Sequence, residues 1–459
     1  MEKAKALRLF KRFLAVLIVS AGLGFAFDAR SQGFTLIRDA EIEHTIRVYS
    51  TPLFQAAGLS PQSIDVYLIQ DKTLNAFVTG GSKMFLNTGL LMRADNPSQV
   101  IGVIAHETGH IAGGHLVGRI EELKTAQWKA LAATLLGIGA AVATGQGAAA
   151  GAATSGGYDV AVKGLLSYTR SQEQSADQAA VTYLRGTEQS PEGLLEFMEI
   201  LGDQEALLSS SQDPYLRSHP LTRDRVSFLE QAVRESPYTG VPSAPELVEM
   251  HERMRAKLIG FLEPPRSVNR RYPPEDQSIP ARYAHSISKF RSGYVDQSLD
   301  LIDGLIAERP NDPYFNELKG QILLENGRVA EALPAYQKAV DILPEEPQLR
   351  LRLAETQTQL NTPEQDKAAL ENISRVLAHE PNNATAWRLA AIAHGRLGDK
   401  GMTTLSLAEM NFARGNWGEA VGQAERAQKI LPENSPAWVR ASDLSQIARQ
   451  QVQRARDRQ

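Results

Sequence analysis

Three residues that could do chemistry together, two histidines and a glutamate, stand in the run His106-Glu107-Thr108-Gly109-His110, which has the pattern H-E-x-x-H. On a helix, side chains four residues apart project from one face, so the two histidines can bind a single metal ion. Glu107 then lies at the flank of that face, where its carboxylate can act as a general base on water. The spacing therefore predicts a metal site with a neighbouring base.

The residues before the motif predict the helix that carries it. Asn96 is a typical N-cap, Pro97 suits the first helical position, and Gln99 stands three residues after the cap. An apolar run follows, so we expect a buried helix from Pro97 to near Gly113. The alternative, a solvated helix with an ordinary pattern of charges, does not account for these apolar flanks.

The third ligand is less obvious. His115 is the nearest further histidine, and the letters H-E-x-x-H-x-x-G even continue through Gly113, as in metzincins, but that class requires a histidine where Leu116 stands. On a continuous helix His115 lies about 140° around the axis from His110, so we expect it to face away. Glu121 and Glu122 are further candidates, in a charged turn that we expect to be solvated.

A second pair of acids opens a later helix. Residues 169–177 read T-R-S-Q-E-Q-S-A-D, and the predicted helix ends near Gly186. Glu173 and Asp177 are four residues apart and share a face. One carboxylate could complete a site with two histidines, while the other accepts the outer N–H of a ligand histidine. Spacing alone leaves this open, because paired acids are also common on solvated helices.

A small sheet is predicted before the motif. Residues 35–58 have helical periodicity, and Gly80-Gly81 forms the turn between the last two of three short strands. The strands are expected at 64–69, 76–78 and 83–86. An exposed edge strand could hold an extended peptide beside the metal. The alternative is a sheet that serves only as a platform for the helix.

Composition limits the chemistry further. The chain has 459 residues, a net charge of −4 and no cysteine. Disulfides and thiolate metal sites are therefore excluded, and any metal takes histidine and carboxylate ligands. There is no basic stripe, so we expect no nucleic-acid partner. The length indicates two or three domains.

Residues 1–31 resemble an export signal. A basic start precedes an apolar segment, 13–27, that is short for a membrane-spanning helix, and small residues precede Gln32. We expect cleavage there and a periplasmic location, the alternative being an uncleaved anchor. The Ala/Gly-rich residues 130–166 predict packed helices or a flap over the site, and leave peripheral membrane association open.

The H-E-x-x-H motif and the later segment T-R-S-Q-E-Q-S-A-D together resemble motifs of the zinc metallopeptidase family of the CAAX prenyl proteases and HtpX, which are gluzincins. The resemblance covers about residues 35–235. It implies one Zn²⁺ per chain, bound by His106, His110 and Glu173, with Glu107 as the general base. Asp177 would then accept a hydrogen bond from the outer N–H of a ligand histidine. Asn75, Ala76 and Phe77 match the family's substrate-strand region.

His219-Pro220, with Arg225 six residues after the histidine, resembles the family's H-P-x-x-x-x-R element. In periplasmic members that histidine can approach the zinc. The resemblance therefore makes His219 a candidate inhibitory fourth ligand. The alternative is a histidine that packs against the core at the start of a helix.

The C-terminal half differs in composition. Residues 236–280 are proline-rich and predict a linker with one helix. From 281 to 445, Pro310, Pro344, Pro381 and Pro432 end successive helical units that match tetratricopeptide repeats, with one extra helix between the last two prolines. Residues 446–459 are expected to form a polar, fraying tail.

The predicted fold is α+β: a mainly helical zincin domain, 32–235, with a small β-sheet, followed by an all-α tetratricopeptide solenoid. The combination resembles the BepA-like periplasmic subgroup. It implies an endopeptidase that cleaves misfolded or stalled envelope proteins and uses its repeats to dock extended polypeptides or the outer-membrane assembly machinery. The alternative is a chaperone or scaffold for outer-membrane protein assembly whose peptidase site is largely latent.

Overall fold

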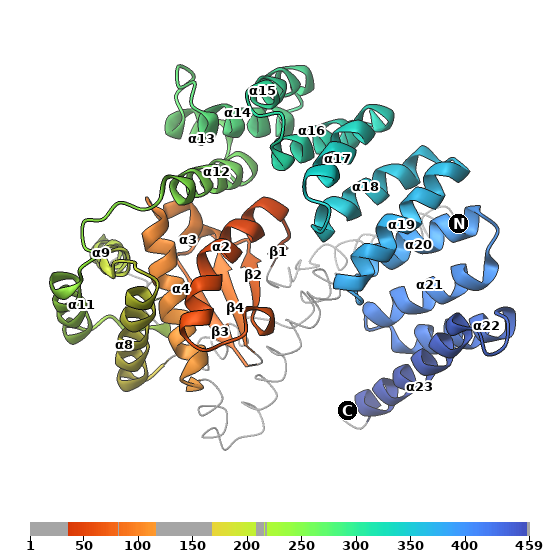
Figure 1. The fold of residues 1–459 in the computed structure, drawn as a ribbon, viewed down its shortest axis with the longest axis horizontal. Helices are drawn as coiled ribbons and strands as arrows, with labels where there is room; N and C mark the ends of the chain where they lie inside the picture. Colours follow the sequence, from red (N-terminus) through yellow and green to blue (C-terminus); the bar gives the residue numbers. More distant parts are fainter. Residues whose placement is uncertain (1–34, 81, 116–167, 208–214, 216–217, 457–459) are drawn as a thin grey trace, which may run out of the picture.

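A computed structural model of the chain describes residues 35–80, 82–115, 168–207, 215 and 218–456 (Figure 1). The predicted export signal, Gly81, both glutamates at 121 and 122, and the Ala/Gly-rich segment lie outside these residues. Within them, no helix combines the length and the apolar character that crossing a membrane requires.

Four short strands form one sheet in the order β1-β2-β4-β3. The central pair, β2 and β4, is parallel, and both outer pairs are antiparallel. Three aromatic rings stack across one face, with Phe85 5.1 Å from Tyr67 and 5.0 Å from Phe77. The opposite face joins the main hydrophobic core. The strands are β1 (Leu36–Ile37), β2 (Asp65–Ile69), β3 (Ala76–Thr79) and β4 (Lys83–Asn87).

The first helix begins later than predicted. Leu36 and Ile37 pair with β2 as a two-residue strand, and the helix α2 starts only after Asp39, whose side chain accepts a hydrogen bond from the Ile42 amide. A strand of two residues is too short to show a period of two. Ile37 was therefore wrongly assigned to the helix, although its apolar side chain packs on the same core.

Helices cover the core face of the sheet, and α4 lies at their centre, in contact with α2, α8, α9 and β3 (Figure 1). Of its sixteen residues only three are not buried. The helices of this part are α2 (Ala40–Ala56), α3 (Thr88–Arg93), α4 (Pro97–Ala112), α8 (Arg170–Gly186), α9 (Glu192–Leu207) and α11 (Arg223–Glu235).

The segment predicted as a linker with one helix contains two, α12 (Pro245–Leu262) and α13 (Pro265–Arg271). The first packs against α2 and α3 on one side and the first repeat helix on the other. Two charged residues of α12 are buried in ion pairs: Arg253 lies 2.7 Å from Glu41, and Lys257 lies 2.8 Å from Asp39. This helix is thus part of the core.

Ten helices follow α13 in the described chain and stack in pairs. Three of them, α20 to α22, lie between Pro381 and Pro432, where the sequence predicted one extra helix. The predicted fraying from Gln446 is wrong, because α23 continues to Arg456 with Leu444 and Ala448 buried beneath it. The ten are α14 (Ile279–Arg291), α15 (Val295–Glu308), α16 (Pro313–Glu325), α17 (Val329–Ile342), α18 (Pro347–Leu360), α19 (Pro363–His379), α20 (Ala384–Arg396), α21 (Lys400–Ala413), α22 (Trp417–Ile430) and α23 (Pro436–Arg456). The predicted fold class is confirmed.

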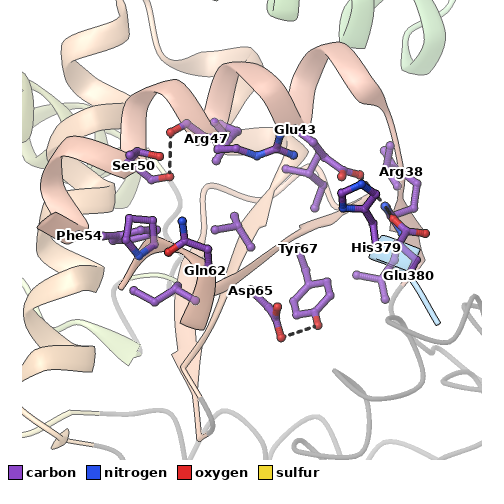
Figure 2. Close-up of a pocket in the computed structure, with 18 of the residues that line it drawn as sticks. Arg38, Glu43, Arg47, Ser50, Phe54, Gln62, Asp65, Tyr67, His379 and Glu380 are labelled. Atoms are coloured by element: carbon purple, nitrogen blue, oxygen red, sulfur yellow. Dashed lines mark hydrogen bonds and ion pairs between the residues drawn. The ribbon is translucent and has the colours of Figure 1, made fainter. Parts of the chain in front are cut away.

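The repeats touch the first domain a second time, beside α2. A cavity of about 530 Å³ lies between α2, β2 and the turn before α20 (Figure 2). Arg38 closes its rim, 2.8 Å from Glu43 and 2.7 Å from Glu380 of the repeats. These side chains are partly exposed, so this second contact is more weakly held than the buried pairs of α12.

Candidate metal centre

The helix that carries H-E-x-x-H begins as its sequence predicts. The Asn96 side chain accepts a hydrogen bond from the Gln99 amide at 3.0 Å, and Pro97 takes the first turn. The Gln99 side chain accepts from the Asp95 amide, one residue earlier than a capping box requires. The helix is buried along the motif, so both histidines and Glu107 are shielded from solvent.

The acidic pair comes from α8, which Thr169 and Gln172 begin with a full capping box. This helix crosses α4 at very short range. A Cβ atom on Gly109 would lie 2.9 Å from the Ala176 carbonyl oxygen, a separation that real Cβ atoms essentially never show. A glycine between the two motif histidines therefore lets the acids of α8 approach them.

Four buried side chains converge: His106, His110, Glu173 and His219. The Nε2 atoms of the two motif histidines are 3.1 Å apart. Glu173 lies 3.4 Å from His106 Nε2 through Oε2 and 3.3 Å from His110 Nε2 through Oε1. His219 Nδ1 lies 3.0 Å from Glu173 Oε1 and 3.4 Å from His106 Nε2.

These separations fit a tetrahedral metal ion. Two ligands about 2.05 Å from one ion lie roughly 3.4 Å apart across a tetrahedral edge. Nitrogens of neutral imidazoles facing each other at this range repel unless a proton or a cation lies between them. Both carboxylate oxygens of Glu107 are buried without a hydrogen-bond partner in the described residues, and Glu107 Oε1 lies 3.5 Å from His219 Nε2. The donor set therefore fits a metal ion with Glu107 beside it.

A buried guanidinium holds the acids in place. Arg225 donates to Asp177 at 2.7 Å and 2.9 Å and lies 2.6 Å from Glu173 Oε2. Asp177 in turn lies 2.9 Å from His106 Nδ1. The H-P-x-x-x-x-R spacing contained Arg225 but did not reveal this contact, which depends on α11 folding back onto α8.

Burial and charge act in opposite directions on these groups. Burial lowers the pKa of His106, but Asp177 and Glu173 outweigh it and raise the value to about 9. Burial would raise the pKa of Glu173, yet the surrounding histidines hold it well below its usual range. Burial raises the pKa of Glu107. Such opposed shifts in one cluster are typical of reactive sites.

Contrary to the prediction, His115 does not face away from His110. Helix α4 ends at Ala112, and Gly114 adopts the left-handed conformation at φ +61°. The chain therefore turns back, and His115 Nδ1 lies 2.9 Å from His110 Nδ1. The prediction assumed a continuous helix, and the turn invalidated it. His115 contacts the outer nitrogen of a candidate ligand and is outside the converging cluster.

Two tyrosines that the sequence did not single out pack on the cluster. The ring of Tyr168 stacks on His110 with centroids 3.8 Å apart, and the ring of Tyr215 stacks on His219 at 4.5 Å. The hydroxyl of Tyr168 also reaches the Val78 carbonyl of β3 at 3.5 Å. Neither tyrosine belongs to a motif whose spacing predicts this packing.

The predicted substrate strand lies close by. Ala76 and Phe77 belong to β3, the last strand of the sheet, which contacts α4. Asn75 precedes it, and its carbonyl accepts a hydrogen bond from the Asn87 amide. The sequence predicts an edge strand, and β3 lies at the edge of the described sheet, where all four of its residues are buried.

Known proteins resemble both parts of the chain. The model of peptidase family M48 matches residues 37–233, and a tetratricopeptide-repeat model matches residues 283–347. The β-barrel assembly-enhancing protease of Yersinia pestis is 26% identical over 398 residues, covering 84% of this chain and 79% of its own length. A protease HtpX homologue of Bacillus pumilus is 45% identical over 69 residues, or 14% of this chain and 22% of that protein.

Among solved structures, MamA covers 38% of this chain and 96% of its own, with 13% identity and a TM-score of 0.28. The two family models match opposite halves of the sequence, and the assembly-enhancing proteases match 84% of the chain. The chain is therefore a metalloendopeptidase with a peptidase family M48 domain, followed by C-terminal tetratricopeptide repeats.

Proposed function

We propose that this protein is a periplasmic, zinc-dependent endopeptidase that cleaves misfolded or stalled envelope proteins. The observation that carries the proposal is the buried convergence of His106, His110 and Glu173 beside Glu107, whose buried carboxylate oxygens have no hydrogen-bond partner among the described residues. The relatives that match 84% of the chain are called β-barrel assembly-enhancing proteases, and this name supports substrates among β-barrel proteins during assembly. The basic and apolar start of the sequence supports export.

The chain's own residues suit this chemistry. When zinc is bound, the chemistry that it supplies is polarisation of the scissile carbonyl and activation of water. Glu107 takes the proton of the attacking water on a carboxylate oxygen and passes it to the leaving amine. Asp177 holds His106 through Nδ1, so that Nε2 faces the metal position. We propose that β3, with Asn75, Ala76 and Phe77, aligns the substrate.

The test is cleavage of an unfolded protein such as reduced, denatured casein by the full chain. Glu107→Gln is expected to retain the metal and to lose cleavage by at least about a hundredfold, since it removes the proton acceptor. Glu230→Gln, at an exposed position of α11, is the matched control and is expected to cleave like wild type. Cleavage by Glu107→Gln at the wild-type rate would refute the proposal.

A second function is favoured by the position of His219. Its Nδ1 completes the four-donor cluster, and a protein side chain in the fourth position takes the place that substrate or water needs. We propose as the alternative a chaperone or scaffold for outer-membrane protein assembly whose peptidase site is largely latent. His219→Ala then raises casein cleavage several-fold, whereas an unchanged or lower rate contradicts latency.

A further inference from the structure

The two histidines of the H-E-x-x-H motif are supported in different ways at their outer ring nitrogens. Both rings turn Nε2 towards the converging cluster, which leaves Nδ1 on the far side of each ring. His106 Nδ1 lies 2.9 Å from a carboxylate oxygen of Asp177. His110 Nδ1 lies 2.9 Å from Nδ1 of a third imidazole, that of His115. The proposed mechanism uses Asp177 but gives no role to His115.

The position of the metal determines which of these two nitrogens donates. Because the proposed function, on which the role of His115 rests, places zinc at His110 Nε2, the proton of this neutral ring is on Nδ1. His110 Nδ1 is therefore the hydrogen-bond donor. His115 Nδ1 is the acceptor, since a neutral imidazole accepts at one of its two nitrogens. The contact thus favours the tautomer of His110 that a metal requires.

The turn after α4 brings His115 to this position. The helix ends at Ala112, and Gly114 then reverses the chain in the left-handed conformation. The imidazole of His115 lies close over Gly113, where a Cβ atom would be 2.5 Å from His115 Nε2. Gln172 of α8 donates from Nε2 to the His115 carbonyl at 3.4 Å. Two glycines and a contact with α8 therefore hold this imidazole in place.

The stacking contact of His110 cannot do the same work. Tyr168 stacks on the His110 ring with centroids 3.8 Å apart and so restrains the plane of the ring. A ring that is flipped about its Cβ–Cγ bond lies in that same plane, but it presents Cε1 where Nε2 was. Only a partner at Nδ1 distinguishes the two orientations. We propose that His115 is a positioning residue of the metal centre, which accepts a hydrogen bond from His110 Nδ1 and thereby holds His110 Nε2 towards the metal.

The test is the zinc affinity of the full chain, measured by competition with a chromogenic chelator. His115→Phe keeps a ring of similar shape but has no acceptor, and it should weaken zinc binding by about 10- to 100-fold, the usual effect of losing such a partner. His115→Asn loses the ring but can present Oδ1 near the position of Nδ1. It is therefore expected to bind zinc more tightly than His115→Phe does.

The order of the two variants separates a hydrogen bond from packing. If the side chain at this position only fills space, the phenylalanine variant should bind zinc better than the asparagine variant. Zinc binding by His115→Asn that is no tighter than by His115→Phe would overturn the positioning role. A wild-type chain that binds no zinc would overturn the proposed function as well, whereas equally tight binding by wild type and both variants would overturn the positioning role alone.

His379→Phe is the matched control, because it makes the same substitution at an exposed histidine, at the end of α19, and should bind zinc like wild type.

Gly113→Ala tests the contact without changing His115, and so does not depend on how the first variants fold. The backbone of Gly113 has an ordinary helical conformation, with φ −74°, so alanine is compatible with it. The added Cβ displaces the imidazole of His115 from His110. Zinc affinity should therefore fall several-fold, while Gly418→Ala, whose Cβ meets nothing within 4 Å, should retain it. Equal affinities for these two alanine variants would contradict the positioning role.

Discussion

At the scale of single residues, the charges around the metal centre depend on one guanidinium. Arg225 is almost fully buried and contacts both Asp177 and Glu173, which reach His106 from two sides. Arg225 therefore neutralises Asp177 and Glu173. Without this positive charge, burial of the two carboxylates beside the histidines would be unfavourable. Arginine suits this position because its planar fork can bind two carboxylates at once.

Arg225→Leu is expected to destabilise the protein by about 3–5 kcal/mol, because it leaves two buried carboxylates without their partner. Urea unfolding measures the change. Arg223→Leu, on the exposed side of the same helix, is the matched control and should stay within about 0.5 kcal/mol of wild type. Equal midpoints for the two variants would show that Arg225 is not the neutralising group.

At the scale of elements, the site depends on how closely α4 and α8 cross. Gly109 provides the space, since a Cβ there would meet the backbone of Ala176 at 2.9–3.0 Å. Alanine favours a helix over glycine by roughly 1 kcal/mol, so propensity alone would make Gly109→Ala stabilising. The backbone contact opposes this gain, because backbone cannot rotate away as a side chain can.

We therefore expect Gly109→Ala to move α8 and to lower the rate of casein cleavage by about a hundredfold, the effect of misplacing a catalytic group by roughly 1 Å. Gly418→Ala in α22 is the control, because its Cβ meets nothing within 4 Å. Its cleavage rate should equal that of wild type. A fully active Gly109→Ala would mean that the close crossing does not position the ligands.

A titratable carboxyl group, that of Glu317, lies where α12 meets the repeats. Glu317 of α16 lies 3.5 Å from Lys257, and burial raises the pKa of Glu317 to about 7 from 4.5 although Lys257 opposes the shift. Between these values the folded state holds a proton that the unfolded state has released. The contribution of this group to stability therefore falls as the pH rises from about 4.5 to 7.

Glu317→Gln removes the titrating group. The free energy of unfolding of this variant, measured relative to that of wild type, should therefore increase as the pH rises from 5 to 8. Urea unfolding at several pH values gives this difference. Glu325→Gln, exposed at the end of the same helix, should keep the wild-type slope. Parallel pH profiles for wild type and Glu317→Gln would show that Glu317 does not titrate in this window.

The sequence predicted what depends on local spacing. The start of α4 at Asn96, the pairing of His106 with His110 on one face and the start of α8 near Thr169 all follow from residues within one or two turns. His115 was misplaced because its position depends on one left-handed glycine that ends the helix. The ion pairs of Arg253 were missed because a buried charge and a solvated charge look the same in a sequence.

At the scale of the whole molecule, the repeats are joined to the peptidase domain through buried charges. Arg253 contacts Glu41 and Asp312, and the Tyr283 hydroxyl donates to Glu41 at 2.7 Å. In Figure 1 the repeats leave α12 and curve past α2 and β1. The first repeat helices are therefore packed against the peptidase domain through these buried contacts.

Deletion of 281–459 is accordingly expected to destabilise the peptidase domain, by about 3–5 kcal/mol, because Arg253 loses Asp312 before α16 and Lys257 loses Glu317 within it. Calorimetry of the truncated and full chains measures this. Deletion of 384–459 retains α12 to α19 and should leave that transition in place. If both truncated chains unfold like the full one, the buried junction does not couple the two parts.

The central claim, that His106, His110 and Glu173 hold a catalytic metal, is tested most directly by metal content. Elemental analysis of the purified full chain should find one zinc ion per molecule. Glu173→Gln and His110→Ala should lose it, while Glu230→Gln should keep it. A wild-type chain that binds no stoichiometric metal, or ligand variants that retain it in full, would contradict the account.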